Sequence, residues 1–303
     1  MKAERASRFW QLMKEGYTLV QTSRLPEALA NFEKARAIAS GSHDRGLADK
    51  AFANKSMVLL EMGEYAKAAR GLREIILRSP DDETTCGASY NLSISLRRQG
   101  QYQKACFYAR LAMEKSRAVK DPGWTARCHN LMGNLHLMQS RLDAALREYR
   151  KALAIRLREK TLNKFGVGIL KDNIGYCLIL LGRSEEGIAE ILEGLTLAEE
   201  VGNTRCVCEC AHDLAFGLMQ TRRLEEAEGH GERALQLAEA NGFQDIVRNC
   251  YYILGEINHL KGDDARRDHF FYLLQQMHPN LPFLRDFLCA FDVSKIIALR
   301  FPQ

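Results

Sequence analysis

Residues 52–80 read FANKSMVLLEMGEYAKAARGLREIILRSP and decide the fold. Two helical patterns flank a turn at Gly63, and the second pattern stops before Pro80. The small residues Ser56 and Ala68 alternate with large apolar residues at spacings of three and four, which place them on one helix face. Small residues at such places let two helices approach to about 8–10 Å. The stretch therefore predicts a closely packed antiparallel helix pair.

The same frame recurs along the chain, with starts every 37 to 42 residues. Seven segments share it: 9–42, 49–82, 86–119, 126–159, 168–201, 208–241 and 248–281. The eighth residue of each segment, its eighth place, is always small: Gly16, Ser56, Ser93, Gly133, Gly175, Ala215 and Gly255. Repeated helix pairs bury a continuous core only by stacking on their neighbours. The pattern predicts an all-α solenoid, an αα-superhelix of about seven helix-turn-helix repeats.

This frame resembles the tetratricopeptide repeat, which also requires Ala at the twentieth place and an aromatic residue at the twenty-fourth. The long spacing between units is similar to that of kinesin light chains, Pins-type adaptors and bacterial peptide-sensing regulators. Several places depart from the pattern, namely Lys55, His136, Asn258 and Arg267. The resemblance implies seven units over residues 1–281, followed by a capping helix and tail over residues 282–303.

The C-terminal segment carries one apolar helical face. Leu284, Phe287, Leu288 and Phe291 are spaced as i, i+3, i+4 and i+7 after the helix-breaking prolines. This helix either caps the last pair or forms a homodimer contact. The tail 296–301 is unusually apolar, so we expect it to be docked.

Composition excludes several classes of protein. Apolar residues make up 46% and charged residues 27%, which is enough for a core and excludes disorder. No apolar run approaches the roughly 20 residues that cross a bilayer. Nine scattered cysteines do not form a disulfide framework, so we expect reduced thiols and a cytoplasmic protein. A net charge of +5 does not by itself indicate nucleic-acid binding.

Charge is uneven along the chain. The stretch from Arg141 to Lys171 contains nine basic and three acidic residues. The stretch from Ser184 to Glu228 contains three basic and eleven acidic residues. Such blocks form solvated helix faces, steer a charged partner or pair two copies of the chain.

The resemblance implies that the first helix of each pair lines a concave groove, with ligand contacts from its places 2, 5, 6, 9, 12 and 13. We expect an apolar surface laddered with asparagines, whose amides can pair with a peptide backbone. The candidate groove residues are Tyr17, Asn54, Met57, Tyr90, Asn91, Ile94, Asn130, Asn134, Asn173, Tyr176, His212, Phe216, Tyr252 and Glu256. The predicted partner is a protein or peptide segment with apolar anchors, either extended or helical.

Signals for chemistry are weak. Cys206, Cys208, Cys210 and His212 form the one cluster of metal-ligand types, but Cys208 points away from the other two cysteines on a helix. We expect no cofactor, no metal site and no catalytic residues. Only one of the five residues that clamp the acidic C-terminal tails of chaperones in related repeat proteins is matched in the first three segments, so a chaperone-tail adaptor is not expected.

The sequence therefore predicts a non-catalytic adaptor or scaffold. The alternative is a regulatory sensor that binds a signalling peptide and modulates an output partner such as a transcription factor or kinase. The first segment begins by Phe9, which leaves no room for an N-terminal effector domain and favours the adaptor. RNA binding through the basic block ranks last.

Overall fold

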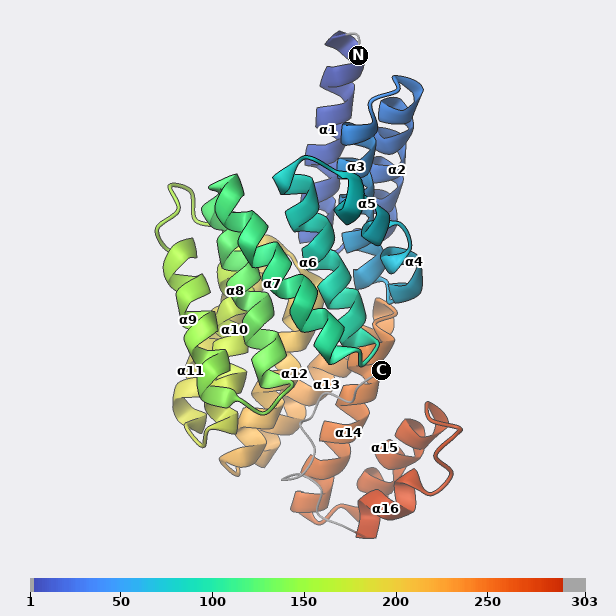
Figure 1. Ribbon diagram of the computed structural model, residues 1–303. Coiled ribbons are helices and arrows are strands. Elements are labelled where there is room, and N and C mark those ends of the chain that lie inside the picture. Colours follow the sequence, from blue (N-terminus) through green and yellow to red (C-terminus); the bar gives the residue numbers. More distant parts are fainter. Residues whose placement is uncertain (1–2, 291–303) are drawn as a thin grey trace. The chain divides into compact units, whose positions relative to one another are not determined.

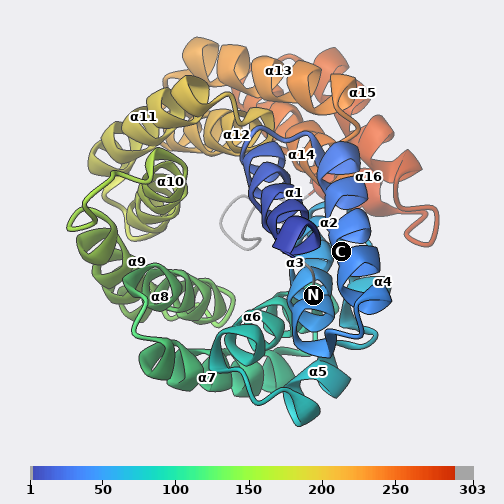
Figure 2. The same cartoon turned by 90° about the horizontal axis from the view of Figure 1, so that it is seen from above.

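The computed structural model describes residues 3–290, and these residues form helices and no strand. The chain is an all-α solenoid of stacked antiparallel helix pairs (Figure 1), as the sequence predicts. It divides into two compact units, residues 1–163 and 164–303, each treated by itself below. Within each unit the first helices of the pairs lie on the inner side of a curve and the second helices on the outer side (Figure 2).

The helix bounds show the pairing. Unit 1 contains α1 (Ala3–Gln21), α2 (Leu25–Gly41), α3 (Arg45–Glu61), α4 (Tyr65–Ala69), α5 (Leu72–Arg78), α6 (Asp82–Arg98), α7 (Tyr102–Val119), α8 (Pro122–Leu137) and α9 (Leu142–Arg156). Unit 2 contains α10 (Lys164–Leu180), α11 (Ser184–Val201), α12 (Thr204–Gln220), α13 (Leu224–Ala240), α14 (Gln244–Lys261), α15 (Asp264–Gln276) and α16 (Leu284–Ala290). The division of the sequence into seven segments, with its boundaries, remains a prediction.

Local sequence explains where the helices begin and end. Side chains of Asp44, Asp81 and Asn203 accept hydrogen bonds from the first turns of α3, α6 and α12, which satisfies otherwise unpaired backbone N–H groups. The turn within each pair contains one left-handed residue with φ between 56° and 80°: Ser23, Gly63, Gly100, Ser140, Gly182, Arg222 and Gly262. The turn that the sequence predicts at Gly63 is among them.

The small residue at the eighth place faces the large residue at the twenty-fourth. A Cβ atom added to Gly133 would lie 2.4 Å from the ring of Tyr149, and one added to Gly255 would lie 2.1 Å from the ring of Phe271. Between α10 and α11 the backbones themselves touch, because a Cβ atom on Gly175 would lie 2.5 Å from the carbonyl oxygen of Gly187. A large side chain on one helix therefore packs against a small residue on the other.

The second pair departs from the expected regular frame, although residues 52–80 carry the repeat pattern most clearly. Its second helix is broken into α4 and α5 at Gly71, whose φ is 88°. Glycine is a poor helix former, and the ring of Phe52 would lie 3.3 Å from a Cβ atom here. Ala68 and Leu72 on either side of the break stay fully buried, so the packing frame survives the interruption.

The C-terminal helix α16 lies against α15. Its backbone N–H at Arg285 donates to the Gln275 side chain over 3.1 Å, and Leu288 is buried. Phe287 is 48% exposed, so the predicted apolar face is covered only in part. Phe291 and the tail 296–301 lie outside the described residues.

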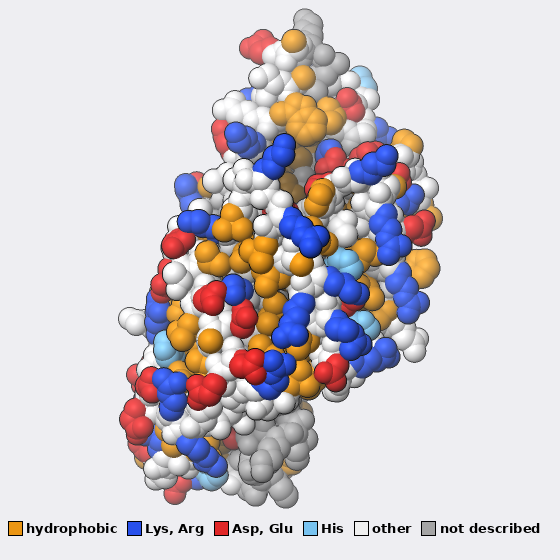
Figure 3. All heavy atoms as spheres, turned by 90° about the vertical axis from the view of Figure 1, so that its left-hand side faces the viewer, with side chains coloured by type: hydrophobic (Ala, Val, Ile, Leu, Met, Phe, Trp, Pro, Cys, Tyr) orange, Lys and Arg blue, Asp and Glu red, His pale blue; other side chains and the backbone are white. Residues whose placement is uncertain are grey.

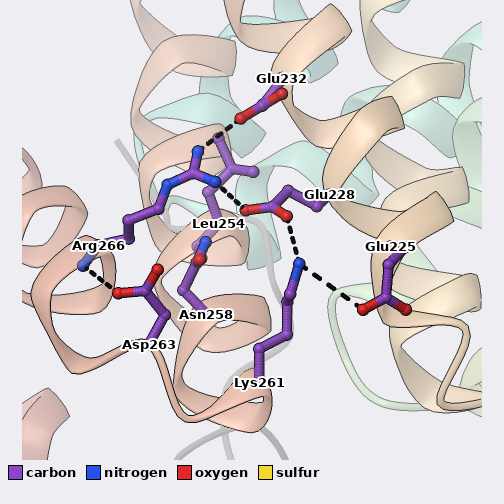
Figure 4. Close-up of polar contacts among 8 residues, drawn as sticks. All are labelled: Glu225, Glu228, Glu232, Leu254, Asn258, Lys261, Asp263 and Arg266. Atoms are coloured by element: carbon purple, nitrogen blue, oxygen red, sulfur yellow. Dashed lines mark hydrogen bonds and ion pairs between the residues drawn. The ribbon is translucent and has the colours of Figure 1, made fainter.

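A charged network ties together the last two pairs of unit 2 (Figure 4). Glu228 on α13 is buried and accepts hydrogen bonds from Lys261 on α14 at 2.6 Å and from Arg266 on α15 at 2.5 Å. Arg266 also reaches Glu232 at 2.5 Å. Burial raises the pKa of Glu228, but the hydrogen bonds from its neighbours outweigh that effect and the pKa lies below its ordinary value. Glu228 therefore joins three helices as a carboxylate.

Candidate peptide-binding site

Side chains from four helices of unit 1 meet in one cluster. The Tyr17 hydroxyl on α1 donates to the Asn54 side-chain oxygen on α3 over 3.3 Å. Arg127 on α8 donates from Nη1 to the same hydroxyl over 3.4 Å, and its guanidinium carbon lies 5.7 Å from the centre of the Tyr17 ring. Residues 110 positions apart are thus brought into contact.

Two further aromatic rings complete the cluster. The Arg127 guanidinium lies 5.0 Å from the centre of the Trp124 ring, and Tyr90 on α6 meets Trp124 edge-on at 6.0 Å. We call Tyr17, Asn54, Tyr90, Trp124 and Arg127 the inner cluster. All five are half-buried, so each keeps part of its surface in solvent. Burial raises the pKa of Tyr90 to about 12, which keeps its hydroxyl protonated at neutral pH.

The start of α8 positions two members of the cluster. Asp121 caps this helix, its carboxylate accepting from the Gly123 N–H at 2.8 Å, and Pro122 occupies the first turn, where its fixed φ suits a helix. Trp124 and Arg127 are three residues apart and therefore share one face of α8. The sequence of this first turn thus places an indole beside a guanidinium.

Arg127 is charged without an ion-pair partner. Burial lowers its pKa, but its interactions with Tyr17, Tyr90 and Asp121 together outweigh burial, so the pKa is raised above the ordinary value. Within residues 3–290 no carboxylate forms an ion pair with this guanidinium. The inner cluster therefore presents a guanidinium held by aromatic rings and a tyrosine hydroxyl.

Other predicted groove residues of unit 1 serve the fold. The Asn91 side chain is buried and donates to the Ala53 carbonyl at 2.6 Å and to the Ser56 hydroxyl at 3.1 Å, which ties α6 to α3. Asn134 accepts from the Tyr149 hydroxyl at 2.8 Å. Asn91 therefore departs from the expected asparagine ladder, because its amide already donates to groups of the chain itself, whereas the Asn134 contact engages only the amide oxygen.

The remaining predicted residues of unit 1 are half-buried. Met57 packs against the core that α1 and α2 form, and Ile94 packs against the cores around α4 to α7. Asn130 is also half-buried and lies one turn beyond Arg127 on α8. Of the eight residues predicted in this unit, Tyr17, Asn54 and Tyr90 belong to the inner cluster.

In unit 2 the predicted groove residues are buried, contrary to the expectation of an open surface. Their side chains pack among neighbouring helices: the rings of Tyr176 and Phe216 lie 5.7 Å apart, and Tyr252 stacks on Phe271 at 6.4 Å. The His212 Nδ1 atom lies 2.8 Å from Asp213. The residues concerned, none more than 6% exposed, are Asn173, Tyr176, His212, Phe216, Tyr252 and Glu256.

Sequence reasoning missed Trp124 and Arg127. Arg127 stands at the second place of the fourth segment, one of the ligand places that the family resemblance implies, and Trp124 lies just before that segment. Including the residue at the second place of each segment among the candidates would have found Arg127. Trp124 had no signal in the repeat frame, because it precedes the first place.

The cysteine cluster in unit 2 has no metal-site geometry. Cys206, Cys208, Cys210 and His212 are all buried, and burial raises the pKa of Cys208 to about 12, which disfavours the thiolate that binds metals. No group of three or more His, Cys, Asp or Glu side chains in the described part of the chain could hold a metal ion.

Several residues of the charge blocks form ion pairs, either within one helix or between neighbouring helices. Lys171 contacts Glu190 and Glu193 at 2.8 and 2.7 Å, and Arg223 contacts Glu226 at 2.7 Å. On the face shown in Figure 3, basic and acidic side chains both occur, with hydrophobic side chains between them. These contacts fit solvated helix faces.

Two family models match the sequence. Both describe the tetratricopeptide repeat, one over residues 84–158 and the other over residues 207–241. The chain therefore contains tetratricopeptide repeats over these residues. The first match contains α8, and with it Trp124 and Arg127 of the inner cluster. A search of curated proteins finds no match.

Several solved structures share this repeat fold at low sequence identity. A Rap protein in complex with competence and sporulation factor is 11% identical with a TM-score of 0.70, covering 91% of this chain and 76% of that one. The Rap conjugation gene regulator of plasmid pLS20, in complex with the Phr* peptide, is 16% identical with a TM-score of 0.69, covering 94% and 76%. Aspartyl phosphate phosphatase F from Bacillus subtilis is 15% identical with a TM-score of 0.64, covering 91% and 72%.

No helix within residues 3–290 combines the length and apolar character needed to cross a bilayer.

Proposed function

We propose that this chain is a protein-interaction module that binds a peptide segment of a partner on the inner helices of unit 1. The observation that carries the proposal is the inner cluster, in which α1, α3, α6 and α8 contribute side chains that remain partly exposed. A ligand that touches all four helices would be recognised by the stacked array rather than by any single repeat.

The chemistry of the cluster suits a peptide. The Tyr17, Tyr90 and Trp124 rings offer apolar area, worth about 25 cal/mol for each Å² removed from water. The Asn54 amide has donors that its contact with Tyr17 does not use, because that contact engages its oxygen. Those donors are suited to a peptide carbonyl. No covalent step is needed, so the proposed role is binding without catalysis.

The similar solved structures support this choice of ligand. One was determined with competence and sporulation factor and another with the Phr* peptide. Their low identity to this chain supports the shared fold, and the inner cluster supplies the separate argument for a peptide. In the same comparison, one protein is named a conjugation gene regulator, which favours a regulatory sensor as the second candidate.

Selection from a degenerate library of nine-residue peptides tests the proposal. Wild-type protein should enrich a set of peptides, and Trp124→Ala should weaken their binding at least tenfold in fluorescence anisotropy. Phe107→Ala is the matched control, because Phe107 is an aromatic residue on the outer helix α7 and is 62% exposed. The melting temperature of each variant separates lost binding from lost folding.

Two results would contradict the proposal. Either the wild type enriches no peptide, or Trp124→Ala folds normally and binds the selected peptides as tightly as Phe107→Ala does. For the regulatory sensor, a second result is required: peptide binding must change the affinity of the protein for a second partner, by thermodynamic linkage.

A further inference from the structure

We infer that Arg127 recognises a carboxylate of the bound peptide, through the N–H groups that the inner cluster leaves unused. This inference rests on the proposed function, because it assigns the chemistry of one anchor in the same site. The ligand class that follows is a peptide bearing a carboxylate beside an apolar or aromatic residue.

The donor count of Arg127 supports this assignment. A guanidinium has five N–H donors, and one donates to the Tyr17 hydroxyl over a long 3.4 Å. The contacts with the Tyr17 and Trp124 rings are cation–π contacts, which consume no donor. Donors thus remain for the two oxygens of a carboxylate, whose geometry matches the guanidinium fork.

Other partly buried arginines of unit 1 have the carboxylate partner that Arg127 lacks. Arg156 has a side chain only 8% exposed and pairs with Glu159 at 2.7 Å. Arg78 reaches both Asp49 oxygens, donating from Nε at 3.1 Å and from Nη2 at 2.5 Å. A partly buried charge is normally paired in this way, because desolvation without a counter-charge is costly. Among the described residues Arg127 has no such partner, and we assign that role to the ligand.

The acidic residue that caps α8 is already engaged elsewhere. Asp121 contributes to the raised pKa of Arg127, yet its carboxylate accepts from the Gly123 N–H at 2.8 Å as the cap of α8. Moving Asp121 onto Arg127 would leave the first turn of α8 without its cap. The rings of Tyr17 and Trp124 meanwhile hold the guanidinium from two different helices, α1 and α8. The anchor is therefore positioned before any ligand arrives.

The test uses peptides from the library selection, synthesised in three forms. The first form has a free C-terminal carboxylate and no Asp or Glu, the second has one Asp and an amidated C-terminus, and the third has Asn in place of that Asp and is also amidated. Each form is titrated against wild type, Arg127→Gln, Arg127→Lys and the control Arg110→Gln. Arg110 is an exposed residue on α7, so its substitution changes net charge equally.

We expect wild type and Arg110→Gln to bind at least one carboxylate form about tenfold or more tightly than the neutral form, the range expected for a charged hydrogen bond. Arg127→Gln should abolish this preference, and Arg127→Lys should restore only part of it, because an ammonium lacks the planar fork. Preference for the first form identifies a chain terminus, and preference for the second identifies an acidic side chain.

Equal binding of all three forms by wild type would overturn the inference while leaving the proposed function intact. Retention of the preference by folded Arg127→Gln would do the same. If no peptide form binds wild type at all, both proposals fail together. The wild-type comparison needs no substitution, so the inference stays falsifiable even if Arg127→Gln does not fold.

Discussion

The inner helices of the two units carry similar residue types at the same repeat places, yet their side chains have different environments. Tyr17 and Tyr90 in unit 1 are half-buried beside a charged guanidinium, whereas Tyr176 and Tyr252 in unit 2 are almost fully buried. Place in the repeat therefore does not determine exposure. What determines it is the set of side chains that neighbouring helices bring to the same place.

The first prediction tests this difference directly. Phe216→Ala should cost about 3–5 kcal/mol in the free energy of unfolding, because it empties a buried site beside Tyr176. Tyr17→Ala should cost about 1–2 kcal/mol, since part of that ring already faces solvent. Urea unfolding followed by circular dichroism measures both values. Equal losses in the two variants would remove the distinction between a surface cluster and a core.

The second prediction concerns the close approach of α10 and α11 in unit 2. Gly175→Ala should destabilise the protein by about 1–3 kcal/mol, because the new methyl group would lie 2.5 Å from the Gly187 carbonyl oxygen. Gly229→Ala is the control, since nothing lies within 4 Å of its added Cβ atom. Alanine in that helix interior should stabilise by about 0.5–1 kcal/mol. Melting temperatures that move in the same direction for both variants would refute the steric argument.

The third prediction uses the charged network of unit 2. Glu228 has a lowered pKa in the folded protein, so its stabilising effect is present at neutral pH and is lost as the pH falls through that pKa. Glu228→Gln should therefore lower stability by about 1–2 kcal/mol at pH 7. The difference from wild type should shrink below about pH 4, where the unfolded carboxyl is protonated too. Thermal melts across pH 3 to 7 would show this convergence, and a constant difference would count against the network.

Much of the fold could be predicted from local pattern. Gly63 marked a turn that needs a left-handed residue, and small residues such as Gly133 marked the places where a ring from the next helix enters. The break at Gly71 was not predicted, because Ala68 and Leu72 keep the repeat frame on both sides of it.

The candidate site was predicted only in part. Tyr17, Asn54 and Tyr90 were found because each stands at a ligand place of its own repeat. Arg127 acquires its role from Tyr17, a residue 110 positions earlier, and no pattern within one repeat can show that contact.

The sequence by itself determined that this chain forms stacked helix pairs, because helix periodicity and the alternation of small and large residues act over a few turns. Only the tertiary structure decided which inner side chains become core and which stay on the surface, because burial depends on helices that are distant in the chain. The same long-range packing brings Arg127 against aromatic rings without a carboxylate partner within the described residues, and on that contact the proposed ligand chemistry depends.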